Sequence, residues 1–381
     1  MRVAVLTTGR QDWGILVSTC RALAEDSLFD LRIIAGGMHL AARYGATLAS
    51  IERDGFQPAA LVPWCDDDPA GANVQREAGA ALAGIGDALA KLAPDALLLV
   101  GDRFETAAGA LAATLARVPI VHLHGGEETE GAFDNQVRHA ITKLSHLHLV
   151  SHPDHAARLR AMGEAATSIH VVGAPGLDNL QRADLATRNE LEADIGPLPA
   201  PVVIVTVHPA TLSGGDADAE ARVVAETMRR VRATYIVTLP NADPGNEAVR
   251  AELLSAARDV SATVVEALGE RRFWGLLRIA DAMIGNSSSA LIEAPVVQLP
   301  AVNVGDRQKG RLRGSNVVDA PANVANVVAA LERVLRREFR DGLRGTSSPY
   351  GDGGSAGRIR AILRDWQPPR PPTKPALPVA S

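Results

Sequence analysis

Cysteine and aromatic residues are scarce in this chain of 381 residues, which has two cysteines and only 3% Phe, Trp and Tyr. With Cys20 and Cys65 alone, a disulfide-rich scaffold and a cysteine-based metal site are excluded, and both residues are expected to be small members of the core. The 46% of hydrophobic residues must then come mainly from Ala, Val, Leu and Ile. Such a composition is typical of a globular protein, and the length suits two ordinary domains.

Clusters of lysine and arginine and long hydrophobic runs are also missing. The formal net charge is −5, and no basic patch predicts binding to nucleic acid or to an anionic membrane surface. The apolar run before Arg10 is too short for a signal peptide, and no stretch approaches the roughly 18 apolar residues of a membrane span. We therefore expect a cytoplasmic protein with a small-molecule substrate, without a nucleic-acid partner and without membrane association.

The chain does contain a regular alternation of short β-branched runs and helix-length amphipathic stretches, which is typical of βαβ units in a parallel sheet. The predicted strands are 2–8, 31–37, 96–102, 119–126, 146–151 and 169–176, followed by a second series at 202–210, 234–241, 262–268, 282–289 and 301–305. The predicted fold class is therefore α/β, with two Rossmann-like parallel-sheet domains. Ligands of such folds bind at the carboxyl ends of the strands, which predicts an interdomain cleft.

The proline-rich segment GPLPAP interrupts regular structure between the two series of strands. It separates an N-terminal domain at 1–180 from a C-terminal domain at 198–350. A further helix is predicted at 351–366 and could pack back on the N-terminal domain. The remaining residues, 367–381, are rich in proline and are expected to be disordered, without a role in the fold.

The motif GRQDWG at 9–14 follows the first strand directly. Gly9 permits a tight turn, Arg10 is presented at the strand end, and the next helix offers its N-terminal amides to an anion. The lack of GxGxxG argues against an ordinary NAD site. A plain strand-to-helix turn with a surface arginine also explains the motif.

The motif GDRFE at 101–105 ends the very apolar strand ALLLV. Asp102 is expected at the open edge of the sheet or against it, where its surroundings can adjust the pKa of a carboxylate. Arg103 beside it can pair with a phosphate. Asp102 could also cap the helix that begins near Phe104, and capping and catalysis are compatible.

The segment HLHGGEETEGAFD at 122–134 is difficult to explain as structure, because a strand covered on both faces has little use for two histidines and four carboxylates. His122 and His124 are expected to share a face of this strand. A zinc or iron site is not favoured, since glycines follow the histidines and no standard ligand spacing is present. Glu127 and Asp134 are the candidates for general acid and base, because proton transfer at carbon needs placed carboxylates.

In the second domain, GNSSSALIE at 285–293 is the strongest single motif. A turn of glycine and serine residues that leads into a helix can place backbone N–H groups and the hydroxyls of Ser287 and Ser288 around a diphosphate. Glu293, inside that helix, can bind ribose hydroxyls. An ordinary serine-capped helix is the alternative.

Other polar residues follow strands of the second domain. His208 in VHP and Asn241 in PNADPG each place one polar side chain at a strand end. The loop GDRQKGR at 305–311 adds Arg307, which suits a phosphate but equally suits solvent.

Taken together and in order, these motifs resemble the UDP-N-acetylglucosamine 2-epimerases, and within them the hydrolysing branch that feeds sialic-acid-type sugar synthesis. The resemblance covers residues 1–340 and includes GRxDWG, GDRFE, HGGExTEGAxD, RHAITKxSHLH, VGxPGLDN, GNSSS and VNxGDRQKGR. It implies a GT-B fold whose C-terminal domain holds the nucleotide, a homodimer, and no metal or organic cofactor.

The resemblance also implies a reaction. A base removes the proton at C2 of the sugar while the nucleoside diphosphate leaves C1, and water then adds to the resulting glycal with inversion at C2. Asp102 matches the family aspartate implicated in elimination, and Asp134 matches the acidic residue at the start of the RHxITK helix. The residues that match nucleotide and diphosphate contacts are Arg10, Gly14, Arg103, His208, Asn241, Ser287, Ser288, Glu293 and Arg307.

One position departs from the family pattern. Members that resemble the N-acetylglucosamine enzymes carry a glutamate just before GGE, where this chain has His124, so Glu127 or His124 itself must replace that carboxylate. The HGGE form with TEGAFD leans toward the branch that resembles enzymes for 2,4-diacetamido-2,4,6-trideoxy sugars, on the legionaminic-acid route. The predicted catalytic set is therefore Asp102, His124, Glu127, Asp134 and His208.

Three functions remain open at this point. The first is a hydrolysing epimerase, which releases free UDP or GDP and a free sugar of the N-acetylmannosamine or diacetamido-trideoxymannose type. The second is the non-hydrolysing epimerase, which returns a nucleotide sugar. The third is a GT-B glycosyltransferase or a sugar-nucleotide-binding protein without this activity.

Overall fold

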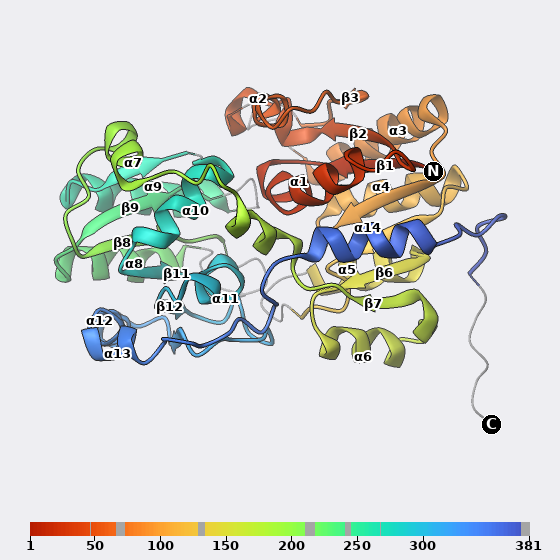
Figure 1. The fold of residues 1–381 in the computed structure, drawn as a ribbon. Coiled ribbons are helices and arrows are strands. Elements are labelled where there is room, and N and C mark those ends of the chain that lie inside the picture. The colour runs from red at the N-terminus through yellow and green to blue at the C-terminus, as the bar shows by residue number, and fades with distance from the viewer. Residues whose placement is uncertain are drawn as a thin grey trace. The chain divides into compact units, whose positions relative to one another are not determined.

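The computed structural model describes residues 1–45, 47–65, 73–128, 134–209, 218–240, 245–266 and 268–374. The chain divides into two compact units (Figure 1). Unit 1 comprises Met1–Glu127, Asp134–Asp178 and Gly353–Ser381, and unit 2 comprises Glu128–Phe133 and Asn179–Asp352. Each unit contains one parallel sheet with helices around it, so the predicted α/β class with two parallel-sheet domains is confirmed.

Unit 1 is built on a sheet with the strand order β3-β2-β1-β4-β5-β6-β7, in which every described pair is parallel. Its strands are β1 Arg2–Thr7, β2 Asp30–Gly36, β3 Ala60–Val62, β4 Ala96–Val100, β5 Ile120–Leu123, β6 Leu147–Val150 and β7 Ile169–Val171. Its helices are α1 Arg10–Ala24, α2 Leu48–Arg53, α3 Val74–Leu92, α4 Phe104–Leu115, α5 Asp134–Leu144, α6 Pro153–Ala161 and α14 Ser355–Asp365, with short 3₁₀ turns η1 Gly37–His39, η2 Ala42–Tyr44 and η3 Ala166–Ser168.

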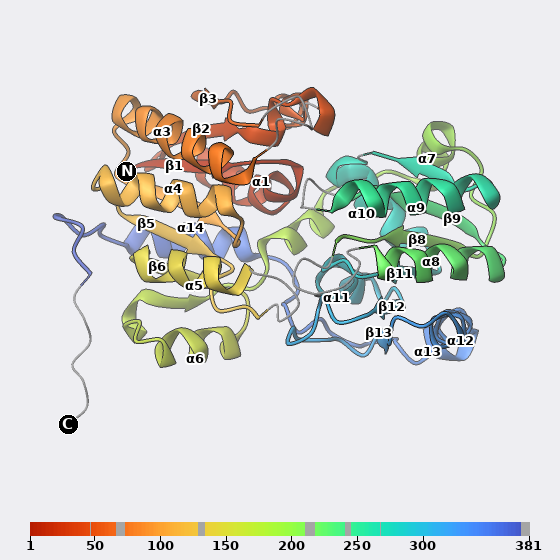
Figure 2. The same ribbon diagram turned by 180° about the vertical axis from the view of Figure 1, so that it is seen from behind.

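Helices cover both faces of this sheet. The last helix, α14, lies beside α1 on one face (Figure 1), and α3, α4 and α5 lie on the opposite face (Figure 2). Ile359 and Leu363 of α14 are four residues apart, so they share one side of the helix and are buried with α1. Burial of side chains of this size contributes about 2 kcal/mol each. The carboxylate of Asp178 accepts the first amides of α14, from Ser355 at 2.9 Å and Ala356 at 2.6 Å, and holds the start of the helix.

Unit 2 has the strand order β10-β9-β8-β11-β12-β13, again with parallel pairs. Its strands are β8 Val202–Thr206, β9 Thr234–Thr238, β10 Thr263–Val265, β11 Ala282–Gly285, β12 Ala301–Val304 and β13 Val317–Ala320. Its helices are α7 Arg188–Ile195, α8 Ala219–Arg230, α9 Asn246–Asp259, α10 Gly269–Ile279, α11 Ser289–Ile292, α12 Val324–Val334 and α13 Arg337–Asp341, with η5 Ala294–Val297, while η4 Pro175–Gln181 spans the boundary between the units.

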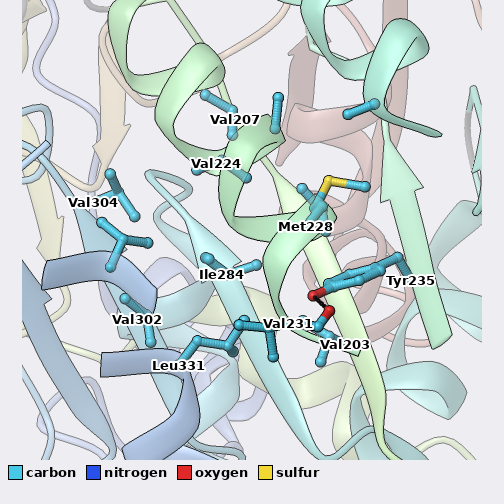
Figure 3. Packing of buried hydrophobic residues seen from close by; sticks show 14 of the residues in the cluster. Val203, Val207, Val224, Met228, Val231, Tyr235, Ile284, Val302, Val304 and Leu331 are labelled. Atoms are coloured by element: carbon cyan, nitrogen blue, oxygen red, sulfur yellow. Dashed lines mark hydrogen bonds between the residues drawn. The ribbon is translucent and has the colours of Figure 1, made fainter. Parts of the chain in front are cut away.

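The core of unit 2 is aliphatic, as the scarcity of aromatic residues predicts. Ile284 of β11, Met228 of α8 and Leu331 of α12 pack together there (Figure 3). Tyr235 is a buried aromatic side chain in this cluster, and its hydroxyl donates to the carbonyl of Val231 at 2.7 Å (Figure 3). A buried polar atom is thereby paired, as the low dielectric of a core requires.

The strands end earlier than their apolar patterns predict, and this is what forms the polar edge of each sheet. The chain leaves β4, β5 and β11 through residues with positive φ: 79° at Gly101, 63° at His124 and 137° at Gly285. Gly101 and His124 lie directly beyond their strands, and Gly285 is the last residue of β11. Asp102, His124, Glu127 and Ser287 therefore lie beyond the strands, whereas His122 lies within β5.

The C-terminal tail differs from its prediction. Residues 367–374 are described, and the ammonium of Lys374 donates to the carbonyl of Thr142 at 2.7 Å and pairs with Glu164 at 2.6 Å. The guanidinium of Arg370 pairs with Asp95. Proline-rich composition predicts disorder because it cannot build a core, but these ion pairs fix the segment to unit 1. Residues 375–381 lie outside the described part.

Two smaller expectations can be compared with the structure. Cys20 is buried in the core of unit 1 and Cys65 is partly buried, and both are free thiols. None of the helices in the described residues is both long enough and apolar enough to cross a membrane.

Candidate active site

Unit 1 brings several predicted site residues to one edge of its sheet. Strands β1, β4, β5 and β6 are neighbours and run in parallel, so the loops that follow them emerge on the same side. These loops carry Arg10, Asp102, His124 and Ser151. Carboxyl ends of adjacent strands are the usual ligand-binding edge of doubly wound sheets.

Asp102 does not cap the helix that follows it. The N-cap of α4 is Arg103, which makes no side-chain capping bond, whereas the carboxylate of Asp102 forms an ion pair with Arg138 of α5. The side chain of Arg138 is only 1% exposed and also donates to the carbonyl of Glu127 and to Asn135, each at 2.7 Å. Arg138 therefore connects the loop after β4 to the loop after β5.

The loop after β5 holds a histidine and a carboxylate in direct contact. Nδ1 of His124 lies 2.6 Å from Oε1 of Glu127, and the same oxygen accepts the hydroxyl of Ser151 at 3.0 Å. Nδ1 of His155 lies 3.0 Å from that hydroxyl. All four residues are buried, so these charge-assisted bonds are formed in a medium of low dielectric, where they are strong.

This arrangement determines which nitrogen of His124 carries the hydrogen when the ring is neutral. A carboxylate only accepts, so Nδ1 of His124 carries the hydrogen, and Nε2 of the neutral ring is left with a lone pair. Nε2 is buried and has no hydrogen-bond partner among the residues described. Burial lowers the pKa of the neighbouring His155 to about 4, so that ring is neutral at pH 7. The group can therefore exchange a proton through one open atom, Nε2 of His124.

His122 has a different position and a different role. Because His124 has a positive φ, the two histidines do not share a strand face, and that expectation is wrong. His122 is fully buried, and its Nε2 donates to the carbonyl of Gly101 at 2.8 Å. Burial lowers its pKa to about 3, so it is a neutral support of the β4 turn. Among the described residues, no group of three or more His, Cys, Asp or Glu side chains is arranged to hold a metal ion.

The GRQDWG segment contains an acidic residue that was not predicted as part of the site. Asp12 is 5% exposed and accepts both the amide and the hydroxyl of Thr8, at 2.9 and 2.5 Å. Burial raises the pKa of Asp12 to about 6, against the opposing effects of Thr8 and the nearby Arg103. A carboxyl group with this pKa can change its protonation near neutral pH.

The basic residues predicted for this edge are present at the ends of helices. Arg10 is the first residue of α1, and Gly14 is buried within that helix. Gly9 has an extended φ of −179°, so the turn there does not need glycine's conformational freedom, contrary to expectation. Arg103 forms an ion pair with Glu105 at 3.1 Å and is partly buried.

In unit 2 the predicted residues follow β8, β11 and β12, which are neighbours in the sheet. His208 follows β8, and its backbone N–H and C=O both bond to the side chain of Asn286 at 2.7 Å. Arg307 follows β12 and donates to the backbone carbonyl of Asn286 at 3.1 Å. Asn286 thus contacts two of the predicted ligand loops, although it was not predicted itself.

The serines of GNSSS begin a shorter helix than expected. Ser287 is buried and its hydroxyl accepts the amide of Ser289 at 3.3 Å, while Ser288 is the N-cap of α11 without a side-chain capping bond. Helix α11 ends at Ile292, so Glu293 is its C-cap residue and does not lie inside it. The alternative of a serine-capped helix is therefore borne out in part: the N-cap residue is a serine, and the hydroxyl of Ser287 accepts the first amide of the helix.

Two predicted residues cannot be compared with the structure in full. Asn241 lies outside the described residues, and Asp134 is described only as the first residue of α5. The site residues that were missed are Asp12, Arg138, Ser151 and Asn286. Asp12, Arg138 and Asn286 belong to the motifs GRQDWG, RHAITK and GNSSS, so membership in a motif was the available signal. For Ser151, the only signal in the sequence was its position at the end of a predicted strand.

Two parallel-sheet units with polar residues at their strand ends define a protein of the GT-B architecture, and comparison with solved structures confirms this fold. A UDP-GlcNAc 2-epimerase from Neisseria meningitidis, solved with bound UDP-GlcNAc, has a TM-score of 0.81 at 16% identity, covering 96% of this chain and 100% of that one. A sequence profile described as UDP-N-acetylglucosamine 2-epimerase matches residues 21–364. The chain belongs to this family of enzymes.

Two relatives with assigned activities are similar over most of their length. The "GDP/UDP-N,N'-diacetylbacillosamine 2-epimerase (hydrolyzing)" of Campylobacter jejuni is 32% identical over 345 residues, which are 89% of this chain and 88% of the relative. The "UDP-N,N'-diacetylbacillosamine 2-epimerase (hydrolyzing)" of Legionella pneumophila is 32% identical over 364 residues, 95% of each chain.

Proposed function

We propose that the protein is a hydrolysing 2-epimerase of nucleotide sugars. It converts a UDP- or GDP-linked 2-acetamido sugar and water into a free sugar inverted at C2 and the free nucleoside diphosphate. Membership of the family supports the epimerase chemistry, and the names of the Campylobacter and Legionella relatives support the hydrolysing branch. The same names favour a 2,4-diacetamido-2,4,6-trideoxy sugar as substrate, as the HGGE form of the motif does.

The observation that carries the proposal is the His124–Glu127 pair, in which Nε2 of His124 has no hydrogen-bond partner among the described residues and can take part in proton transfer. The expected glutamate before GGE is absent, and this pair supplies an ionisable group at the same place in the chain. Glu127 orients the ring and stabilises the imidazolium that forms when Nε2 accepts a proton. Such positioned acid–base groups contribute roughly 10²–10⁴-fold to rate.

The reaction needs two proton transfers at C2, on opposite faces of the sugar. In the elimination, a base takes the C2 proton, the C–H electron pair becomes the C1=C2 double bond, and the C1–O bond to the nucleoside diphosphate breaks. In the hydration, an acid gives a proton to C2 from the other face, while water bonds to C1 and loses a proton to a carboxylate. We assign the first transfer to Asp102, held by Arg138. We assign the second to His124, which gives the proton from Nε2 as an imidazolium paired with Glu127, and Asp134 takes the proton that water loses.

The remaining predicted residues are assigned to the nucleotide. The proposed contacts are Arg10, Gly14, Arg103, His208, Asn241, Ser287, Ser288, Glu293 and Arg307. Cationic side chains and backbone N–H groups stabilise the charge that develops on the departing diphosphate. His208 is also retained as a candidate proton donor to that leaving group. We further propose a cytoplasmic homodimer that supplies sugars for nonulosonic acid synthesis, without a metal or organic cofactor.

The proposal is tested by offering the purified protein UDP-N-acetylglucosamine and the UDP- and GDP-linked diacetylbacillosamines in D₂O. Proton and phosphorus NMR should show free UDP or GDP and a free 2-epimeric sugar with deuterium at C2. A product that remains a nucleotide sugar would identify a non-hydrolysing epimerase. Binding without turnover of any of the three would identify a sugar-nucleotide-binding protein or a glycosyltransferase.

A further inference from the structure

Asn286 in unit 2 is completely buried, and its side chain bonds to segments that surround the proposed nucleotide site. Its Oδ1 accepts the amide of His208, and its Nδ2 donates to the carbonyl of the same residue, both at 2.7 Å. The two bonds resemble one rung of a strand pair, placed just beyond the end of β8. The backbone of His208 is therefore held by a side chain from the neighbouring strand end.

This arrangement requires the end of β11 to approach the end of β8 closely, and Gly285 permits that approach. Its φ is 137°, and a Cβ at this position would lie 1.9 Å from the carbonyl oxygen of Thr206. Only glycine fits such a contact. The amide of Asn286 then bonds to that same carbonyl at 3.1 Å. The end of β11 is thus brought directly against the end of β8, and Asn286 comes into line with His208.

Nδ2 of Asn286 has a second acceptor, the carboxylate of Glu220 from α8, at 2.5 Å. Glu220 is buried beneath the loop after β12: a Cβ at Gly305 would lie 1.9 Å from its Oε1, and the backbone of Asp306 bonds to its carboxylate. Burial raises the pKa of Glu220, and these hydrogen bonds oppose that effect. One carboxylate therefore joins Asn286 to the loop after β12, which is the third loop of this site after those that follow β8 and β11.

The third loop also bonds back to Asn286. Nε2 of Gln308, whose side chain is buried, donates to the carbonyl of Asn286 at 2.7 Å, and Arg307 donates to it at 3.1 Å. Val207 and Val304, immediately before these loops, are packed in the core of the unit (Figure 3). The bases of the loops are thus fixed by packing, and their first polar residues by Asn286 and Glu220.

Burial of a carboxylate and an amide in a core costs free energy of desolvation, and apolar side chains of the same size would often stabilise the fold equally well. What the polar pair supplies is geometry, since the bonds of Asn286 are directional and reach different segments of the chain. Those segments carry His208, Ser287 and Arg307, which are three of the residues assigned to the nucleotide.

We infer that Asn286 and Glu220 are positioning residues that set the relative placement of the three loops that hold the nucleoside diphosphate. The inference rests on the proposed function, because it assumes that these loops bind the nucleotide. Neither residue needs to touch the ligand. Loss of the pair should therefore weaken nucleotide binding through displacement of His208 and Arg307, while the proton-transfer residues of unit 1 stay intact.

The test uses the full-length protein with Asn286→Asp, Glu220→Gln and the double substitution. In Asn286→Asp a carboxylate faces the carboxylate of Glu220, so we expect the Kd for UDP or GDP, measured by calorimetry, to rise 10-fold or more. The KM for the nucleotide sugar should rise with it, and kcat should fall as well, because His208 is a candidate proton donor to the leaving diphosphate. In the double variant the amide at position 220 can donate to the carboxylate at position 286, which relieves the repulsion between two carboxylates. The carbonyl of His208 still lacks the donor that Nδ2 of Asn286 supplied, so we expect only part of the affinity to return.

Asn316→Asp is the matched control. Asn316 is also a buried asparagine of unit 2, and its Nδ2 donates to the carbonyls of Ala290 and Leu299 and not to the three loops. It should lose stability without the selective rise in Kd. If the control raises Kd as much as Asn286→Asp, or if Asn286→Asp binds UDP and GDP as tightly as the wild-type protein, the positioning role is refuted.

A measurement without ligand separates this inference from the proposed function. Hydrogen exchange followed by mass spectrometry should show faster exchange in peptides covering 203–209 and 283–289 of Asn286→Asp than in Asn316→Asp. If wild-type protein binds neither UDP nor GDP, the proposed function fails, whereas faster exchange would still establish the connection between the loops. Unchanged exchange together with wild-type affinity would overturn the inference alone.

Discussion

The imidazole of His124 and the carboxylate of Glu127 are joined by a hydrogen bond of 2.6 Å, three residues apart in a buried turn. The turn depends on His124 having a φ of 63°, which a non-glycine residue adopts at an energetic cost. The geometry places Nδ1 on the carboxylate and leaves Nε2 open. Strain of this kind is common where a structure positions a reacting group, and it supports a direct role for His124.

If these two residues act as one unit, their substitutions should not be additive. We expect Glu127→Gln and His124→Gln each to lower kcat for nucleotide release by roughly 10²–10⁴-fold with little change in KM. The double variant should be no slower than the slower single variant. Steady-state assays of nucleotide release check this. Ser145→Ala, which removes a buried hydroxyl bonded to the carbonyl of Ile141, is the control. Multiplying effects would mean that the two side chains act independently.

The ion pair between Asp102 and Arg138 predicts different effects for its two members. Asp102→Asn keeps the shape and an acceptor for Arg138 but removes the base, so nucleotide release should be abolished while substrate binding stays nearly intact. Arg138→Gln should lower the free energy of unfolding by about 3 kcal/mol, because it leaves Asp102 without its buried partner. Urea unfolding and calorimetric binding measure the two outcomes. Unchanged release rates for Asp102→Asn would refute its assigned role.

The extent of the sheets could be predicted where strands are buried on both faces. Strand β4 reads ALLLV and every residue of it is buried, so its apolar run was visible in the sequence. Strands β3 and β13 were not predicted, although β7 and β10, which are also short edge strands, were. Leu61 in β3 is 53% exposed, and an edge strand with one open face shows no continuous apolar run.

The candidate site was predicted through its motifs, but its contacts were not. Asp102 and Arg138 are 36 positions apart, and only the adjacency of β4, β5 and α5 brings them together. Nothing in the local sequence indicates the positive φ of His124. The sequence therefore suggested an unbroken strand with two histidines on one face. Tertiary packing decides such features, and local patterns carry little information about them.

The burial of Asp12 predicts a dependence of stability on pH. Its pKa is about 6 in the folded protein against an ordinary value of 3.8, so the folded state retains a proton that the unfolded state has lost between these values. Stability from this residue is fully present below the ordinary value and is lost as the pH rises through 6. Relative to Asp12→Asn, the wild-type free energy of unfolding should fall by about 2 kcal/mol between pH 4 and pH 7. Urea titrations of both proteins at each pH provide the difference, and parallel curves would show that Asp12 does not titrate in this range.

Glu164, which Lys374 of the C-terminal tail contacts, predicts a pH dependence of stability with the opposite sign. Burial raises the pKa of Glu164, but hydrogen bonds from His148, Lys143 and Lys374 outweigh it and hold the value at about 2. A lowered carboxyl pKa stabilises the fold above the ordinary value of 4.5, and that effect is lost as the pH falls toward 2. Removal of Lys374 takes away one of the three donors, so the pKa of Glu164 in the folded state should rise and less of this stabilisation should remain at neutral pH.

Lys374→Ala should therefore lower the free energy of unfolding at pH 7 by about 1 kcal/mol, since Glu164 is buried but keeps two donors. This deficit should stay constant down to about pH 4 and shrink only as the pH falls toward 2, because protonation of Glu164 then removes the ion pair in both proteins. Arg370→Ala, in the same tail, is the control: its ion pair with Asp95 involves an arginine that is 72% exposed, and such pairs contribute about 0–1 kcal/mol. Urea unfolding at pH 7, 5 and 2 compares the two. If the two variants are equally stable at each pH, the contact between Lys374 and Glu164 adds nothing to the fold; a larger loss for Lys374→Ala that shrinks toward pH 2 would show that the tail is part of unit 1.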